Sequence, residues 1–309
     1  MSDQISTLLA SKSHSRRKFL AGLGLTAGTA AMIGCGSDSK TTSTTPTPTP
    51  STTITDADIL NFALNLEYLE AEFYLRGVTG SGLGAADIGA NPGATTGGGQ
   101  VAFATPAIKA YAMEIANDEQ AHVRFLRSAI TKAGGTPVDK PAIDLVNSFN
   151  GAASAAGIGT SFNPFNDENS FLVGAFVFED VGVTAYNGAV TLISDKTILG
   201  AAAAIHATEA YHAAEIRTLL VYNSDPSFLA AAVKISALRG AASAASGAAS
   251  GEVAPSSSAI VPADSNSLAY PRTTDQVLDI IYLNATGSAA SKGGFYPNGM
   301  HGKITASAK

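Results

Sequence analysis

Four long segments of the chain carry apolar residues every three to four positions, which is the spacing of an amphipathic or buried helix. Each segment follows a residue that can cap a helix N-terminus: Thr55, Thr105, Asp167 or Asp195. Gly77 is expected to end the first helix, since glycine is common just beyond helix C-termini. The predicted helices span residues 56–76, 105–133, 168–194 and 196–222.

The connections between these segments predict how the helices are arranged. A glycine-rich loop, 77–104, separates the first two helices, and almost no loop separates the last two, so each pair should be antiparallel. A long connection, with a short helical turn near 142–149, joins the second helix to the third. We therefore predict an all-α protein, with a four-helix bundle over 56–222 and a long crossover between helices 2 and 3.

Residues 223–309 are expected to form a C-terminal extension of the bundle. A fifth helix is predicted over 226–240 and a short sixth helix over 273–283. The stretch between them is rich in Ala, Ser, Gly and Pro, and the last residues are expected to be loop. One or two extra helices should therefore pack against the bundle.

The pattern of the N-terminal 35 residues predicts a signal for export and not a part of the folded domain. Ser15-Arg16-Arg17-Lys18-Phe19-Leu20 resembles the signature of a Tat signal peptide, and the apolar stretch 19–34 suits its hydrophobic region. The stretch ends in Met32-Ile33-Gly34-Cys35, which resembles a lipobox and predicts lipidation of Cys35. The alternative is cleavage near Ala31, which would leave a free soluble protein. Residues 36–55 are rich in Ser, Thr and Pro and are predicted to be a linker.

We therefore expect the protein in the periplasm or cell envelope, with a lipid anchor as its contact with the membrane. Net charge is −6 and charged residues make up only 14%, with no basic cluster beyond the extreme N-terminus. This balance disfavours nucleic acid as a partner, because such binding needs a basic surface. The single cysteine excludes an intramolecular disulfide framework and a cysteine-based metal cluster.

Two Glu-x-x-His motifs carry the candidate chemistry: Glu119-Gln-Ala-His122 in the second predicted helix and Glu209-Ala-Tyr-His212 in the fourth. Residues three apart lie on one face of a helix, so each motif presents a carboxylate and an imidazole side by side. The chain has only 5 His, so chance accounts poorly for two such motifs. A doubled Glu-x-x-His is typical of a di-metal site in a four-helix bundle.

Such a site also needs one Glu from each of the other two helices. The middle of the third helix offers Glu179, a carboxylate in an apolar stretch where burial is costly without a partner or metal. The alternative places Glu179 on a solvent-facing edge. Tyr186 follows it by seven residues, on the same face two turns later.

The first helix offers three carboxylates, of which Glu67 is preferred because Tyr74 follows it at the same spacing. Glu70 lies on the same broad face and could serve as an outer partner or an alternative ligand. Glu72 lies on the opposite side and is expected to face solvent. The predicted metal ligands are Glu67, Glu119, His122, Glu179, Glu209 and His212.

Four carboxylates balance two divalent ions, and oxygen plus imidazole ligands favour iron or manganese, with zinc an alternative. Tyr74 and Tyr186 could bond the ligands or simply pack. Asp118 and Asp180 could orient the imidazoles or be solvated charges. His301 is expected to be an ordinary loop residue.

The sequence resembles the ferritin-like superfamily, in the branch of exported proteins related to desiccation-associated proteins. The resemblance rests on segments 66–74, 118–122, 178–180 and 208–212, and on the glycine- and tyrosine-containing segment 293–300. It implies a di-metal centre that reacts with O2 or peroxide, as a ferroxidase or oxidant scavenger. The alternative is a structural or stress-protective envelope protein. The linker and the long extension disfavour a 24-subunit storage cage.

Overall fold

The computed structural model describes residues 53–246 and 251–308 of the 309-residue chain. The predicted signal peptide, Cys35 and most of the linker lie outside the described residues. In the described part, seven helices and two very short strands form one compact unit. The prediction of an all-α bundle with extra C-terminal helices is confirmed.

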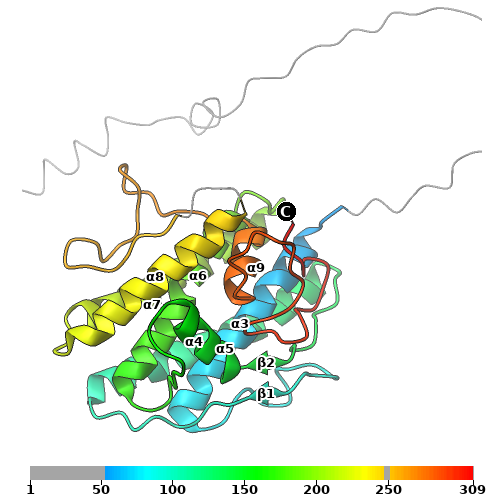
Figure 1. The fold of residues 1–309 in the computed structure, drawn as a ribbon. Coiled ribbons are helices and arrows are strands. Elements are labelled where there is room, and N and C mark those ends of the chain that lie inside the picture. The colour runs from blue at the N-terminus through cyan, green and yellow to red at the C-terminus, as the bar shows by residue number, and fades with distance from the viewer. Residues whose placement is uncertain (1–52, 247–250, 309) are drawn as a thin grey trace, which may run out of the picture. The chain divides into compact units, whose positions relative to one another are not determined.

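The bundle consists of α3 (Asp56–Thr79), α4 (Pro106–Lys132), α6 (Glu168–Ala189) and α7 (Lys196–Val221). Helix α3 packs mainly on α4 and α6 mainly on α7, and α3 and α6 join the two pairs (Figure 1). The crossover between α4 and α6 contains α5 (Asn147–Ala155). Its strand β2 (Ile143–Asp144) pairs in parallel with β1 (Thr95–Thr96) of the first loop, a pairing that the sequence pattern did not predict.

Side-chain caps fix the start of three bundle helices. Thr55 and Asp58 form the predicted capping box, and the carboxylates of Asp167 and Asp195 accept hydrogen bonds from the first turns of α6 and α7. Thr105 precedes α4, but its hydroxyl donates to Glu168 Oε1 at 2.8 Å instead of capping α4. That bond ties the start of α4 to the start of α6.

Two predicted helix ends within the bundle are wrong. Helix α3 continues past Gly77 to Thr79 and ends at Gly80, whose φ of +81° suits glycine. Gly77 is needed for packing, because a Cβ there would lie 2.2 Å from the Phe171 ring. Helix α6 ends at Ala189 and not at residue 194, and the backbone N–H groups of Ser194 and Asp195 donate to the Asp56 carboxylate and not to carbonyl groups of α6.

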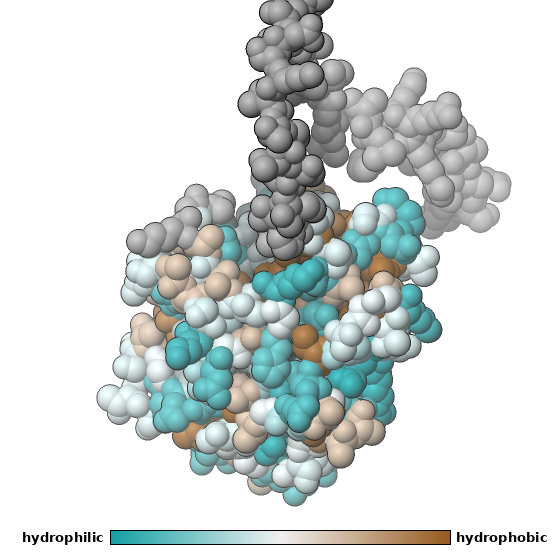
Figure 2. Space-filling model, turned by 90° about the vertical axis from the view of Figure 1, so that its right-hand side faces the viewer, coloured by the Kyte–Doolittle hydropathy of each residue, from teal (hydrophilic) through white to brown (hydrophobic). Residues whose placement is uncertain are grey.

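The extension contributes α8 (Pro226–Ala245) and α9 (Thr274–Ile281), close to the two predicted helices. Helix α8 packs on α6 and α7, and α9 packs on α8 and α6 (Figure 1). Of the described helices, α8 is long and apolar enough to span a membrane by length and composition, but it buries Arg239 against the bundle. The face drawn in Figure 2 intersperses hydrophilic and hydrophobic residues, with only small apolar patches.

Candidate metal centre

All six predicted ligands converge in the middle of the bundle. The side chains of Glu67, Glu119, His122 and Glu209 offer ligand atoms that lie within 4.8 Å of one another. A second group, within the same limit, joins Glu119 and Glu209 to Glu179 and His212. Two carboxylates therefore belong to both groups, which is the arrangement expected of carboxylates that bridge two ions.

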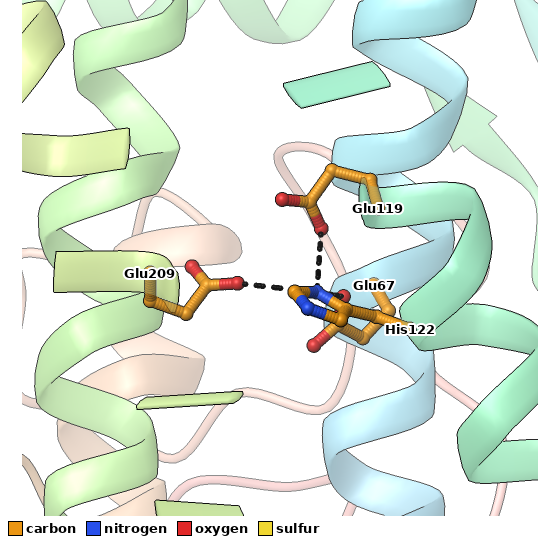
Figure 3. A group of neighbouring side chains, drawn as sticks. All are labelled: Glu67, Glu119, His122 and Glu209. Carbon is orange, nitrogen blue, oxygen red and sulfur yellow. Dashed lines mark hydrogen bonds and ion pairs between the residues drawn. The ribbon is translucent and has the colours of Figure 1, made fainter. Parts of the chain in front are cut away.

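Each helix of the bundle contributes to the centre. Figure 3 shows the carboxylate of Glu67 on α3, and those of Glu119 on α4 and Glu209 on α7, pointing toward the His122 ring. Glu179 of α6 completes the set, and all four carboxylates are fully buried. Helical geometry accounts for the two Glu–His pairs, because residues i and i+3 share a face.

Both imidazoles turn Nδ1 toward the carboxylates. His122 Nδ1 lies 3.2 Å from Glu67 Oε2 and 3.5 Å from oxygens of both Glu119 and Glu209. His212 Nδ1 lies 3.1 Å from Glu119 Oε1 and 3.5 Å from Glu179 Oε2. The other nitrogen of His212, Nε2, lies 3.2 Å from Asp118 Oδ2. Asp118 is thus placed to orient this ring, as outer carboxylates do for metal-bound histidines.

Close as these atoms are, most of them do not hydrogen-bond. Within residues 53–246 and 251–308, both carboxylate oxygens of Glu119 and of Glu209 lack a hydrogen-bond partner, as do Glu179 Oε2 and His212 Nδ1. Buried polar atoms are normally paired, because an unpaired one loses its hydration without compensation. The unpaired atoms face a shared centre, so a cation is the partner that suits them.

The two tyrosines cross between helices. Tyr74 of α3 donates to Glu179 Oε1 of α6, and Tyr186 of α6 donates to Glu67 Oε1 of α3. Each hydroxyl occupies one oxygen of a carboxylate that belongs to one group only. The repeated Glu-x6-Tyr spacing of the sequence therefore corresponds to reciprocal hydrogen bonds across the bundle.

Three other residues have surroundings that the sequence pattern did not predict. Glu72 does not face solvent: it is buried, pairs with Arg76 at 2.7 Å and accepts from Leu83 N–H. Asp180 orients no imidazole, because Arg217 and Arg239 bind it. His301 is a loop residue, as expected, and its Nδ1 lies 2.8 Å from the Asp139 carbonyl oxygen, within hydrogen-bond distance.

Charge and burial together shift the pKa values of the centre. Burial raises the pKa of Glu67 to about 7, although His122 acts against the rise. Burial and neighbouring carboxylates hold the pKa of Glu70 and of Glu209 well above the usual range. Burial acts to lower the histidine pKa values, but the surrounding carboxylates raise that of His122 to about 11 and that of His212 to about 12. The cluster of carboxylates therefore attracts positive charge.

The donor set fits two metal ions. Four carboxylates and two imidazoles supply the oxygen and nitrogen atoms that iron, manganese and zinc accept, and the negative charge of the carboxylates balances two divalent cations. Glu67 with His122, and Glu179 with His212, would each hold one ion. Glu119 and Glu209 would be shared.

Comparison with known proteins agrees with this geometry. A protein-family model for the ferritin-like domain matches residues 55–222. Ferritin-like catalase Nec2 of Nesocodon mauritianus is 29% identical over 273 residues, which cover 81% of this chain and 84% of that protein. Desiccation-related protein PCC13-62 of Craterostigma plantagineum is 29% identical over 269 residues, with the same coverage of 81% and 84%. The chain belongs to the ferritin-like domain family.

Proposed function

We propose that this chain is a di-metal protein, holding two iron or manganese ions, that reacts with O2 or peroxide and so oxidises Fe(II) or removes oxidant. The observation that carries the proposal is the pair of overlapping Glu/His groups in the bundle core. When bound, two such ions supply paired one-electron changes of oxidation state. The similarity to a protein named a ferritin-like catalase supports peroxide as one of the oxidants.

The residues of the chain explain how such chemistry is confined. The four carboxylates are fully buried, and His212 is 5% exposed, so bulk water is excluded from the centre. His122, with a side chain 12% exposed, is the most accessible of the six. Tyr74 and Tyr186 fix the orientation of Glu179 and Glu67, which leaves the other oxygen of each carboxylate for an ion.

Peroxide removal needs no further reductant. In dismutation, one H2O2 molecule is oxidised to O2 while a second is reduced to two water molecules. We expect protein loaded with manganese or iron to release O2 from peroxide, and the Glu119→Ala and Glu209→Ala double variant to lose this activity. The double variant should keep its far-ultraviolet helical signal, which shows that the fold persists. Peroxide loss at the same rate in both proteins contradicts the proposal.

The second candidate is a structural or stress-protective role, which the similarity to a desiccation-related protein favours. In that case the metal would only stabilise the bundle. The test is to purify the protein from its native source, determine its metal and record its ultraviolet-visible spectrum with peroxide. Bound zinc and a spectrum that peroxide does not change support this second role over the first.

We also propose export by the Tat route to the periplasm or cell envelope, with a lipid on Cys35. This part rests on the sequence of residues 1–35. Mass spectrometry of the mature N-terminus distinguishes a lipidated Cys35 from cleavage near Ala31.

A further inference from the structure

A small, partly open cavity lies beside the metal centre, between α3, α6, α9 and the C-terminal loop. Its volume is about 20 Å³, and Leu69, Glu70, Phe178, Gly182, Ile281 and Phe295 are among the residues that line it. Such a volume holds one water molecule, which needs on the order of 10–15 Å³, and approaches the size of a two-oxygen molecule. We refer to this cavity as the Glu70 chamber.

Glu70 is the chamber's one charged residue, and it has no partner in the described part of the chain. The residue is 4% exposed, and no hydrogen bond or ion pair is found between its carboxyl group and any other part of residues 53–246 and 251–308. The other residues that line the Glu70 chamber are apolar. A buried carboxyl group without a hydrogen bond is costly, so the chamber lacks one polar partner.

Gly182 connects the chamber to the metal centre. A Cβ at position 182 would lie 2.3 Å from Glu209 Oε2 and 3.3 Å from Glu70 Oε1. Both carboxyl groups therefore approach the same point of the α6 backbone, where any side chain would displace them. Glu209 is one of the two carboxylates common to both ligand groups. A molecule bound to Glu70 thus lies next to the centre.

We propose that the Glu70 chamber binds one small O–H donor, which is water in the resting protein and hydrogen peroxide during turnover. Size excludes organic substrates. O2 has no O–H group to donate and is a weak acceptor, so it would leave the acceptor oxygen of the Glu70 carboxyl group unpaired, whereas peroxide and water can both donate to that oxygen and accept from a carboxyl O–H. The peroxide half of this inference rests on the proposed function, and the water half does not.

Two variants of Glu70 separate the outcomes. Glu70→Leu replaces the carboxyl group by an apolar, somewhat bulkier side chain, and Glu70→Gln keeps both the size and the hydrogen bonding. Glu72→Gln is the matched control, because Glu72 is a buried glutamate of the same helix that pairs with Arg76 outside the chamber. All three variants should bind zinc with the stoichiometry of the unaltered protein.

The first measurement is a high-resolution crystal structure of each metal-free protein. We expect an ordered water within hydrogen-bond distance of residue 70 in the unaltered protein, in Glu70→Gln and in Glu72→Gln, and none in Glu70→Leu. A dry chamber in the unaltered protein overturns the inference. This result does not depend on any catalytic activity.

The second measurement compares oxidants in the metal-loaded proteins. In Glu70→Leu, the KM for peroxide should rise about tenfold, the effect of one lost hydrogen bond, while the rate of Fe(II) oxidation by O2 stays within about twofold. Glu70→Gln should restore the peroxide KM. If Glu70→Leu loses activity equally with peroxide and with O2, or binds less zinc per chain, Glu70 is a metal ligand and the inference is overturned. If the unaltered protein reacts with neither oxidant, the proposed function fails, and the crystallographic result still decides whether the chamber binds an O–H donor.

Discussion

Both oxygens of Glu119 and of Glu209 are buried without a hydrogen-bond partner in the described residues, and His212 Nδ1 beside them has no hydrogen-bond partner either. Ionised carboxylates in such surroundings repel one another and lose their hydration. Without metal, protons on the imidazoles offset part of this charge, as the raised pKa values of His122 and His212 indicate. At the scale of single residues, metal ions would therefore compete with protons for one set of atoms.

Metal loading should release protons. The pKa values of about 11 and 12 mean that His122 and His212 are protonated in the metal-free protein at pH 8, whereas a ligand nitrogen must be unprotonated. We expect at least two protons released per fully loaded chain, two from the imidazoles and more where a carboxyl group of raised pKa such as Glu209 loses its proton. The affinity for the two ions should rise by at least a hundredfold per pH unit near pH 8. Zinc titration in weak buffer with a pH indicator measures both.

His206→Gln is the control for this experiment. Burial lowers the pKa of His206, and its side chain belongs to neither ligand group. The variant should release the same number of protons as the unaltered protein. Zinc binding with no proton release would show that the imidazoles are not the ligands.

At the scale of elements, α6 joins the centre to the C-terminal extension. One side of this helix carries Glu179 and Tyr186, while Asp180 on a neighbouring side accepts hydrogen bonds from Arg217 at 2.8 Å and Arg239 at 2.7 Å. Arg239 also binds Glu252 at 2.7 Å, and Arg272 binds the same carboxylate. These buried ion pairs hold the extension against the helix that supplies Glu179.

Glu252 should stabilise the protein in a pH-dependent way. Burial acts to raise its pKa, but Arg239 and Arg272 outweigh burial and lower it below its usual value. A carboxyl group with a lowered folded-state pKa contributes stability above its unfolded pKa of about 4.3, and loses it as pH falls through the folded value. Glu252→Gln should therefore lower the free energy of unfolding by about 3 kcal/mol at pH 7, and by less below pH 4.

Urea unfolding of both proteins across this pH range tests the prediction. Glu114→Gln is the control, since Glu114 is exposed and should change the free energy of unfolding by less than about 0.5 kcal/mol. If the loss of unfolding free energy in Glu252→Gln is as large below pH 4 as at pH 7, Glu252 stabilises the protein by packing and not by its charge.

At the scale of the whole molecule, local patterns predicted the four bundle helices and the residues that meet in their core. Periodicity marks a helix and its faces, and the repeated Glu-x6-Tyr spacing distinguished Glu67 from Glu70 without knowledge of the packing. Both features depend on residues within two helical turns. The reciprocal bonds of Tyr74 and Tyr186 show why the same spacing occurs in both helices.

Features that depend on distant segments were not predictable in this way. Glu72 is buried because the glycine-rich loop returns over α3 and Leu83 N–H donates to it. Asp180 is bound by Arg239, from a helix beyond the bundle, as well as by Arg217 of α7. The Glu70 chamber is closed in part by Phe295 of the C-terminal loop. No periodic pattern encodes such contacts.

The central claim is that the bundle core holds two metal ions, and anaerobic titration of the metal-free protein with Fe(II) or Mn(II) tests it most directly. We expect saturation near two ions per chain, with none bound tightly by the Glu119→Ala and Glu209→Ala double variant of unchanged helicity, because both groups share these carboxylates. Failure of the unaltered protein to bind, or equal binding by the double variant, would contradict the account.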